Sequence, residues 1–248
     1  MFMYTDYTQH LLDNVKKIHF IGCGGSGMYP LIQILAAKGY DISGSDVLDG
    51  SIIRSEREMG VKVTLGHSAD NVIGADLVVY SAAIAKDNVE LNAAASYGIT
   101  TVERSVLLGY VSRLYKQSIC VSGTHGKTTT TSMLSHILLA GELDPTISVG
   151  GILKAIGGNI RVGNSEYFVT EACEYTNSFL HFFPKIGVIL NIDEDHLDFF
   201  KDLADIRNSF HLFAKLLPEN GTLVINGDID KIEEITSDLS CRVITFGK

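Results

Sequence analysis

The centre of the chain reads Ser118-Ile119-Cys120-Val121-Ser122-Gly123-Thr124-His125-Gly126-Lys127-Thr128-Thr129, and a helical pattern follows through Ala140. The largely apolar run before the first glycine predicts a short buried strand. A glycine-rich turn between a strand and a helix lets backbone N–H groups surround phosphates, and the helix N-terminus adds partial positive charge. In such loops a lysine reaches the outer phosphates and the next hydroxyl ligates Mg²⁺, the roles predicted here for Lys127 and Thr128. The stretch therefore predicts an α/β domain that binds a nucleoside triphosphate.

The spacing of this loop departs from the general phosphate-loop pattern, which places four residues between its glycines. Here only Thr124 and His125 stand between them. The alternative is a Gly-Lys-Thr helix cap with no ligand, but the strand and helix on either side favour the nucleotide interpretation. We expect ATP to contact the whole loop, namely Gly123, Thr124, His125, Gly126, Lys127, Thr128 and Thr129.

Composition limits the possible partners. The 248 residues are 46% hydrophobic, which is enough for two ordinary domains. A net charge of −9 without a basic tract argues against nucleic acid or an anionic membrane as the main partner. No secretion signal or membrane-spanning run is expected. The four cysteines lie far apart without a C-x-x-C pair, which favours reduced thiols in a cytoplasmic protein. They are Cys23, Cys120, Cys173 and Cys241.

A second glycine-rich loop lies near the start of the chain. A predicted strand, Lys17 to Ile21, runs into Gly22-Cys23-Gly24-Gly25-Ser26-Gly27 and then into a helical pattern through Lys38. The next predicted strand, Tyr40 to Ser45, is followed by Asp46, where dinucleotide-binding folds place a ribose-binding acid. Alone, this half suggests a nicotinamide-dependent dehydrogenase. Because the loop recognises a diphosphate at a helix N-terminus, NAD, FAD and UDP-sugars all remain possible ligands.

The remaining patterns alternate between strands and helices along both halves. Further strands are predicted at 62–65, 76–81, 99–102, 167–170, 185–192, 222–225 and 242–246, with helices at 88–97, 106–115 and 203–217. This alternation predicts a Rossmann-like doubly wound sheet followed by a truncated P-loop ATPase-type α/β domain. We place a UDP-sugar-binding domain at 1–115 and a partial ATP-binding central domain at 116–248, with no amino-acid-binding domain in the chain.

Acidic residues follow two predicted strands of the second half. Glu171 ends the strand at 167–170, beside the phosphate loop, where a ligand of nucleotide-bound Mg²⁺ is expected. The strand at 185–192 is followed by Asp193-Glu194-Asp195-His196-Leu197-Asp198. These side chains could surround a second metal through His196, or they could form the solvated acidic start of a helix. The sequence leaves both interpretations open.

Several segments together resemble the Mur ligases, which add amino acids to a UDP-linked peptidoglycan precursor. The short Gly-Thr-x-Gly-Lys-Thr loop is the form that this family uses. The segments occur in the order of the family and are His19–Met28, Ser122–Thr131, Glu171–Glu174 with Asn177–Leu180, and Asn191–Asp198.

This resemblance implies roles for individual residues. Lys127 would act on ATP, and Thr128, Glu171 and His196 would hold Mg²⁺ ions, with Lys127, Glu171 and His196 as the catalytic set. UDP-sugar contacts would come from Gly22, Gly24, Gly25, Ser26, Gly27, Met28, Asp46, His67, Ser81, Arg104, His125, Asn177 and Ser178.

The resemblance also implies a reaction. ATP would phosphorylate the carboxylate of UDP-N-acetylmuramate, and the amine of L-alanine would attack the acyl phosphate. Because family members are longer and bind the amino acid in a third domain, we expect this chain to bind the UDP-sugar, to bind ATP weakly and not to complete ligation. Alternatives are a related ligase that recycles intact peptide onto UDP-muramate, a non-catalytic UDP-sugar-binding module, and a dehydrogenase, which would leave Lys127, Thr128 and Glu171 unexplained.

Overall fold

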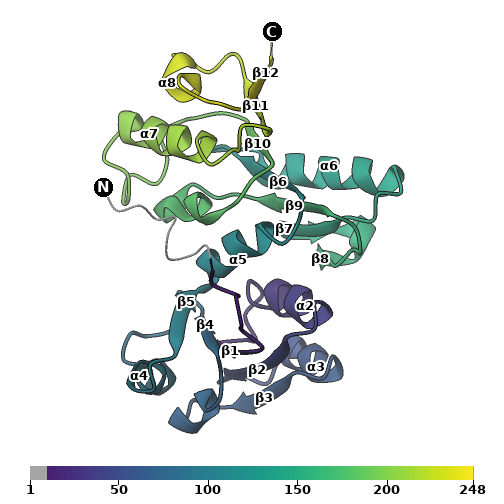
Figure 1. Cartoon of the computed structure of the whole chain (residues 1–248), viewed down its shortest axis with the longest axis vertical. Helices are drawn as coiled ribbons and strands as arrows, with labels where there is room; N and C mark the ends of the chain where they lie inside the picture. Colours follow the sequence, from purple (N-terminus) through teal and green to yellow (C-terminus); the bar gives the residue numbers. More distant parts are fainter. Residues whose placement is uncertain (1–9, 248) are drawn as a thin grey trace. The chain divides into compact units, whose positions relative to one another are not determined.

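The computed structural model describes residues 10–247, which form two compact units that divide between Leu108 and Gly109 (Figure 1). The division falls inside helix α5 (Arg104–Ser112), so the domain boundary after residue 115 stays a prediction. Within residues 10–247, no helix has the length and apolar character needed to cross a membrane.

The first unit is built on a five-stranded parallel sheet in the order β3-β2-β1-β4-β5. Helices α2 and α3 lie on one side of this sheet and α4 on the other (Figure 1). Because all five strands are parallel, their carboxyl ends lie at one edge of the sheet. Ligands bind at this edge in sheets that helices cover on both faces. The elements are β1 (Lys17–Ile21), α2 (Tyr29–Ala37), β2 (Asp41–Asp46), α3 (Ser51–Glu58), β3 (Lys62–Leu65), η1 (Ala69–Val72), β4 (Leu77–Tyr80), α4 (Val89–Ser96) and β5 (Thr100–Glu103).

Local sequence explains why these elements form. The side chains of Ile18, Phe20 and Ile21 in β1 are fully buried, as expected for a central strand covered on both faces. Helix α2 carries Pro30 in its first turn, where a missing N–H costs no hydrogen bond. The Asn88 side chain caps α4 by accepting hydrogen bonds from the first-turn amides. The apolar side chains of the sheet and of its helices are thus buried between them.

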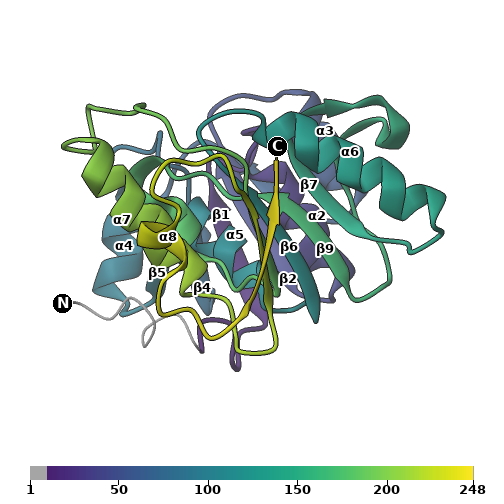
Figure 2. The same ribbon diagram turned by 90° about the horizontal axis from the view of Figure 1, so that it is seen from above.

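The second unit is a seven-stranded sheet in the order β12-β11-β10-β6-β9-β7-β8. Strand β8 runs antiparallel to β7 and all other pairs are parallel. Helices α6 and α7 lie on opposite sides of the sheet (Figure 2). Phe179 stacks on Phe213 and meets Phe210 edge to face in the core beneath α7. The elements are β6 (Gln117–Ser122), α6 (Lys127–Ala140), β7 (Thr146–Leu153), η2 (Lys154–Ile156), β8 (Gly158–Arg161), β9 (Tyr167–Glu171), η3 (Tyr175–His181), β10 (Ile186–Ile189), α7 (Leu203–Ala214), β11 (Thr222–Asn226), α8 (Glu233–Thr236) and β12 (Arg242–Phe246).

The predicted α/β class is confirmed: a Rossmann-like sheet precedes a sheet whose central strand runs into a phosphate loop. One predicted strand is too long, because β10 ends at Ile189 rather than at residue 192. The apolar pattern continues to Ile192, which is buried by packing although the ladder has ended. The α-helices and strands that were not predicted from the sequence are α3, α8, β7 and β8, and the three short 3-10 helices η1, η2 and η3 were not predicted either.

Candidate active site

The phosphate loop joins β6 to α6 through two glycines with positive φ. Gly123 has φ +134, and a Cβ there would lie 3.0 Å from the Leu190 side chain and 3.1 Å from its backbone nitrogen. Gly126, the N-cap residue that precedes α6, has φ +85 in the left-handed region. The Asn191 side chain bonds both backbone groups of His125, at 2.8 Å and 3.0 Å. The segment after β10 therefore fixes the shape of the loop.

The amine of Lys127 lies inside this loop and is held by protein groups. It donates to the carbonyl oxygens of Gly123 at 2.6 Å and Thr124 at 3.1 Å. It also bonds both carboxylate oxygens of Glu174, at 3.0 Å and 2.9 Å. The Glu174 side chain is only 2% exposed, so this is a buried ion pair. A phosphate that reaches Lys127 would compete with the Glu174 carboxylate for the same amine protons.

Thr128 and Glu171 form a pair of oxygen ligands next to Lys127. The Thr128 hydroxyl donates to Glu171 Oε2 at 2.9 Å, and the backbone N–H of Gly150 donates to Oε1 at 2.5 Å. Mg²⁺ prefers oxygen ligands and usually keeps several waters and phosphate oxygens, so one hydroxyl and one carboxylate fit it well. The structure thus brings two of the three predicted metal residues together.

His196, the third predicted metal residue, has other neighbours. Its Nε2 lies 3.9 Å from Glu174 Oε1, and its ring lies 4.5 Å from that of Tyr175 between centroids. The Tyr175 hydroxyl donates to Asp198 at 2.8 Å. Within residues 10–247, no three His, Cys, Asp or Glu side chains gather as a metal-binding group. A metal role for His196 stays a prediction.

The interpretation of residues 193–198 as the start of a helix is wrong. The segment is irregular, His196 has φ +53, and α7 begins only at Leu203. Asp202 caps that helix by accepting from the Asp205 N–H. The acidic residues precede the helix by several positions, so they do not serve its first turn.

Asn177 and Ser178 lie at a sharp bend that comes after Glu174. Thr176 and Asn177 both have left-handed backbones, with φ +54 and +58. The Asn177 side chain accepts a hydrogen bond from Ser209, and Ser178 donates to the carbonyl of Tyr175 at 2.7 Å. Both side chains hold the bend in place, and their predicted contact with substrate stays a prediction.

Cys173 lies within the same segment, between Glu171 and Glu174. It is the one exposed thiol of the four cysteines, all of which are free. Partial burial is the main reason that the pKa of its thiol is raised. Burial also raises the pKa of the Cys120 thiol, which lies in β6.

In the first unit, the predicted contact residues gather around the glycine loop after β1. The backbone N–H of Gly24 donates to Asp46 Oδ2 at 2.9 Å, and Asp46 Oδ1 accepts from Leu48 N at 3.0 Å. A Cβ on Gly27 would lie 3.2 Å from the Arg104 Nε, so the guanidinium lies against the loop. Asp46 and Arg104 therefore both lie at the loop, and their contact with a UDP-sugar stays a prediction.

Two further neighbours of the loop are Ser81, which follows β4, and Met28, the N-cap residue of α2. A Cβ on Gly22 would lie 3.7 Å from the Ser81 Cβ, which places Ser81 beside the loop. The Met28 side chain, by contrast, is 1% exposed and its N–H donates to the Gly25 carbonyl. The structure gives Met28 a packing role, so any ligand contact from it would be through the backbone.

Beneath this loop lies a buried acid that the sequence did not reveal. Glu56 of α3 is fully buried, and neither of its carboxyl oxygens has a hydrogen-bond partner of normal geometry. Burial raises its pKa to about 7, the Cys23 thiol lowers it, and the charge of Asp46 raises it. The pKa of the Cys23 thiol is raised by burial and by Glu56.

Sequence comparisons agree with this geometry. Residues 17–116 match the pattern of the Mur ligase family catalytic domain, and residues 121–248 match the Mur ligase middle domain. The chain belongs to the Mur ligase family. It is 54% identical over 237 residues to a UDP-N-acetylmuramate–L-alanine ligase of Clostridium novyi, covering 96% of this chain and 52% of that protein. The chain spans about half the length of the curated relatives it matches.

Solved structures of Mur ligases share the fold. A UDP-N-acetylmuramate:L-alanyl-γ-D-glutamyl-meso-diaminopimelate ligase from Neisseria meningitides superposes with a TM-score of 0.81 at 28% identity, covering 94% of this chain and 78% of that one. The UDP-N-acetylmuramate–alanine ligase of Thermotoga maritima gives 0.74 at 31% identity, with coverages of 94% and 53%. Membership of the family thus rests on sequence and on fold.

Sequence reasoning missed Glu174 as a functional residue. It stands three positions after Glu171 at the carboxyl end of β9, and a second acid there is a signal that could have drawn attention. Its contact with Lys127 joins residues 47 positions apart, which no local pattern of the sequence indicates.

Proposed function

We propose that this chain provides the UDP-sugar and ATP sites of a ligase that joins L-alanine to UDP-N-acetylmuramate. The observation that carries the proposal is the phosphate loop with Lys127 at its centre and the Thr128–Glu171 pair beside it. A separate glycine loop with Asp46 and Arg104 supplies a site for a second nucleotide. Two such loops match the need for a nucleotide-linked substrate and for ATP.

The proposed chemistry begins with activation of a carboxylate. The γ-phosphoryl group of ATP passes to a carboxylate oxygen of the sugar's lactyl group, which breaks its bond to ADP and forms an acyl phosphate. The alanine amine then attacks the carbonyl carbon, phosphate leaves, and the nitrogen loses a proton. Such transfers need positioning and charge neutralisation rather than a protein nucleophile.

The residues of the phosphate loop have distinct parts in this scheme. Lys127 would neutralise charge on the transferring phosphoryl group, once a phosphate has replaced Glu174 at its amine. Thr128 and Glu171 would hold Mg²⁺, which offsets the charge of the outer phosphates when bound. His125, whose backbone is fixed by Asn191, would present its exposed ring to the sugar end of the substrate.

A thermal-shift comparison tests the proposed ligands. A ligand at 100 times its Kd stabilises the fold by about 2.7 kcal/mol. We expect UDP-N-acetylmuramate to raise Tm strongly, ATP with Mg²⁺ to raise it weakly, and NAD⁺ to leave it unchanged. A shift with NAD⁺ alone would contradict the proposal and favour a dehydrogenase.

A second assay identifies the group that is joined to the UDP-sugar. The structural likeness to the peptide ligase favours a peptide as the alternative substrate. For the 248 residues assayed alone, we propose binding of both nucleotides without completed ligation. Phosphate release by this chain that requires both UDP-N-acetylmuramate and L-alanine would overturn that expectation, and release with the peptide instead would favour the alternative. The free cysteines lead us to propose the cytoplasm as its location.

A further inference from the structure

A buried carboxylate in the first unit binds one of the predicted substrate residues. Glu90 of α4 is fully buried, yet its two oxygens accept hydrogen bonds from four donors. The Ser45 hydroxyl and His67 Nδ1 reach Oε2 at 2.6 Å and 3.2 Å. The Ser68 backbone N–H, at 3.3 Å, and the Asn71 side-chain amide reach Oε1. The carboxylate is therefore saturated with donors.

This saturation fixes the charge of Glu90. Burial alone would raise its pKa, but the neighbouring His19 ring and the hydrogen bonds from Ser45 and Asn71 outweigh burial and hold the pKa at about 2. The side chain is thus ionised at neutral pH. An ionised carboxylate has no proton to donate and can only accept hydrogen bonds.

The charge in turn fixes the proton of the His67 ring. Because Glu90 only accepts, His67 Nδ1 must carry the hydrogen between them. The nearby Ser45 hydroxyl lies 3.3 Å from the same nitrogen, but its own hydrogen is used in the shorter bond to Glu90. A neutral His67 therefore has a bare Nε2, which accepts hydrogen bonds.

His67 Nε2 is the free end of this arrangement. No hydrogen bond joins it to another residue of the described range 10–247, and the side chain keeps 20% of its surface exposed. Ser45, which approaches the ring, immediately precedes Asp46, the residue that holds the Gly24 amide. The open nitrogen thus belongs to the edge of the sheet that carries the glycine loop.

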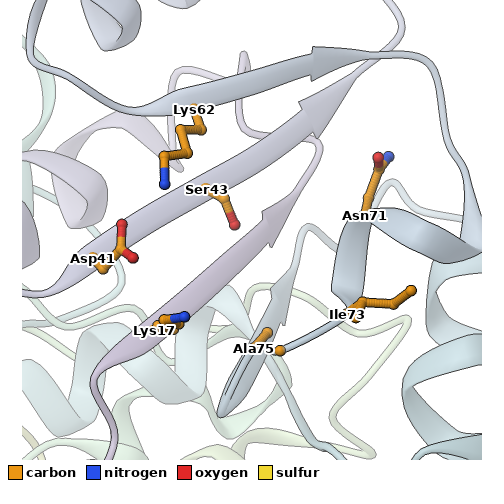
Figure 3. Close-up of a pocket in the computed structure, with 8 residues that line it drawn as sticks. Lys17, Asp41, Ser43, Lys62, Asn71, Ile73 and Ala75 are labelled. Carbon is orange, nitrogen blue, oxygen red and sulfur yellow. The ribbon is translucent and has the colours of Figure 1, made fainter.

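The same network extends toward the amino edge of the sheet. His19 Nε2 lies 3.8 Å from Glu90, and His19 Nδ1 bonds the Ser43 hydroxyl at 2.9 Å. Ser43 and Asn71 line a pocket of about 210 Å³ at the amino ends of the first three strands (Figure 3). Polar groups therefore brace Glu90 from both β1 and β2, which keeps its carboxylate in one position.

We propose that Glu90 is a positioning residue for the UDP-sugar site: it holds His67 as the Nδ1–H tautomer, so that Nε2 accepts a hydrogen bond from a nucleoside hydroxyl or imide N–H. This inference rests on the proposed function. It also excludes one ligand group, because a bare Nε2 does not donate to a phosphate oxygen. In Glu90→Gln, the amide N–H₂ would face the same donors and would favour the Nε2–H tautomer of His67.

The test combines a spectroscopic and a binding measurement on the 248-residue chain. ¹⁵N–¹H NMR of histidine-labelled protein should show Nδ1 of His67 protonated at neutral pH, and Glu90→Gln should lose that state. By calorimetry, we expect Glu90→Gln and His67→Ala each to weaken UDP binding about 10-fold. The double variant should be no weaker than His67→Ala, because Glu90 acts through His67.

Controls separate the possible outcomes. Glu58→Gln, an exposed change in α3, should leave UDP affinity and the His67 tautomer unchanged. An Nε2–H tautomer in the unmodified chain, additive losses in the double variant, or full UDP affinity in Glu90→Gln would each overturn the inference. Absence of UDP binding in the unmodified chain would instead count against the proposed function, while the tautomer still tests the inference. If Glu90→Gln does not fold, Glu90→Asp takes its place and should keep the Nδ1–H state.

Discussion

The two glycine loops of this chain are both held by carboxylates, but by different parts of the loop. In the first unit, Asp46 accepts from a backbone amide of the loop at Gly24. In the second, Glu174 binds the amine of Lys127, and Glu171 stands beside Thr128. The first loop has no lysine within Gly22–Gly27, and the second has a lysine and an oxygen pair suited to Mg²⁺. On the proposed function, this difference would let the first loop receive a diphosphate through its amides, and the second a triphosphate through a cation and a metal.

Removal of Lys127 is the strongest test of this difference between the two loops. Lys127→Ala should weaken binding of ATP with Mg²⁺ by on the order of 100-fold, because a hydrogen bond to a charged group contributes about 1.5–3 kcal/mol. UDP-N-acetylmuramate binding should be spared. Calorimetry with both ligands measures the two effects, and loss of both would show that the sites are not independent.

This substitution leaves the buried Glu174 without its partner, which is costly in itself. The comparison is therefore repeated with Glu174→Gln present in both proteins, so that only the lysine differs. Lys154→Ala, an exposed lysine in η2, is the matched control and should bind ATP normally.

The second prediction concerns the dependence on magnesium. Glu171→Gln should reduce the gain in ATP affinity that Mg²⁺ provides by roughly 10-fold, because a neutral amide is a poorer ligand than a carboxylate. ATP titrations with Mg²⁺ and with EDTA measure that gain. Glu166→Gln, an exposed acid before β9, should keep it in full. UDP-sugar affinity that also depended on Mg²⁺ would contradict the distinction between the loops.

The third prediction tests the close packing of the first loop. A Cβ on Gly24 would lie 3.0 Å from Asp46 Oδ2 and 3.1 Å from Ile53 Cδ1, so in Gly24→Ala these side chains or the loop must shift by a few tenths of an ångström. We expect UDP-sugar affinity to fall by a factor of about 5, with ATP affinity unchanged. Gly50→Ala is the control, since nothing lies within 4 Å of a Cβ there. Equal affinities for both variants would show that the loop tolerates the added atom.

The smallest expected effect is on the free energy of unfolding, and it comes from Glu56, which is buried beneath the first loop. The pKa of Glu56 is raised from 4.5 to about 7, so the folded chain binds more protons than the unfolded chain between these values. Its contribution to stability is therefore lost as pH rises from about 4.5 to about 7. Glu56→Leu should raise the free energy of unfolding at pH 8 by about 1–3 kcal/mol and by less at pH 5.

Urea unfolding at the two pH values measures this difference, and Glu58→Leu on the exposed face of α3 is the control. Equal stabilisation at pH 5 and pH 8 would mean that the Glu56 carboxyl does not titrate in the folded chain between those values. The second unit should be insensitive to the change, so ATP affinity serves as a check that its fold is intact.

A feature of this chain could be predicted from the sequence when its interacting residues lie close together along the chain. The loops, their flanking strands and Glu171 were predicted because strand, turn and helix signals are local. Strands β7 and β8 were missed because their glycines interrupt the alternation, and their pairing is set by neighbours across the sheet. The roles of Glu174, Glu90 and Glu56 depend on partners from distant segments, which no single stretch of sequence displays.

The exposed thiol at Cys173 gives the chain a built-in reporter of its proposed ATP site. The other three cysteines are buried, so a thiol-reactive fluorophore would label one position without any engineered substitution. Its place between Glu171 and Glu174 puts the dye next to both carboxylates that must respond when a phosphate reaches Lys127. Because the pKa of this thiol is raised, labelling is favoured at alkaline pH. Fluorescence from that position would follow nucleotide arrival in real time, in solution, without a coupled assay.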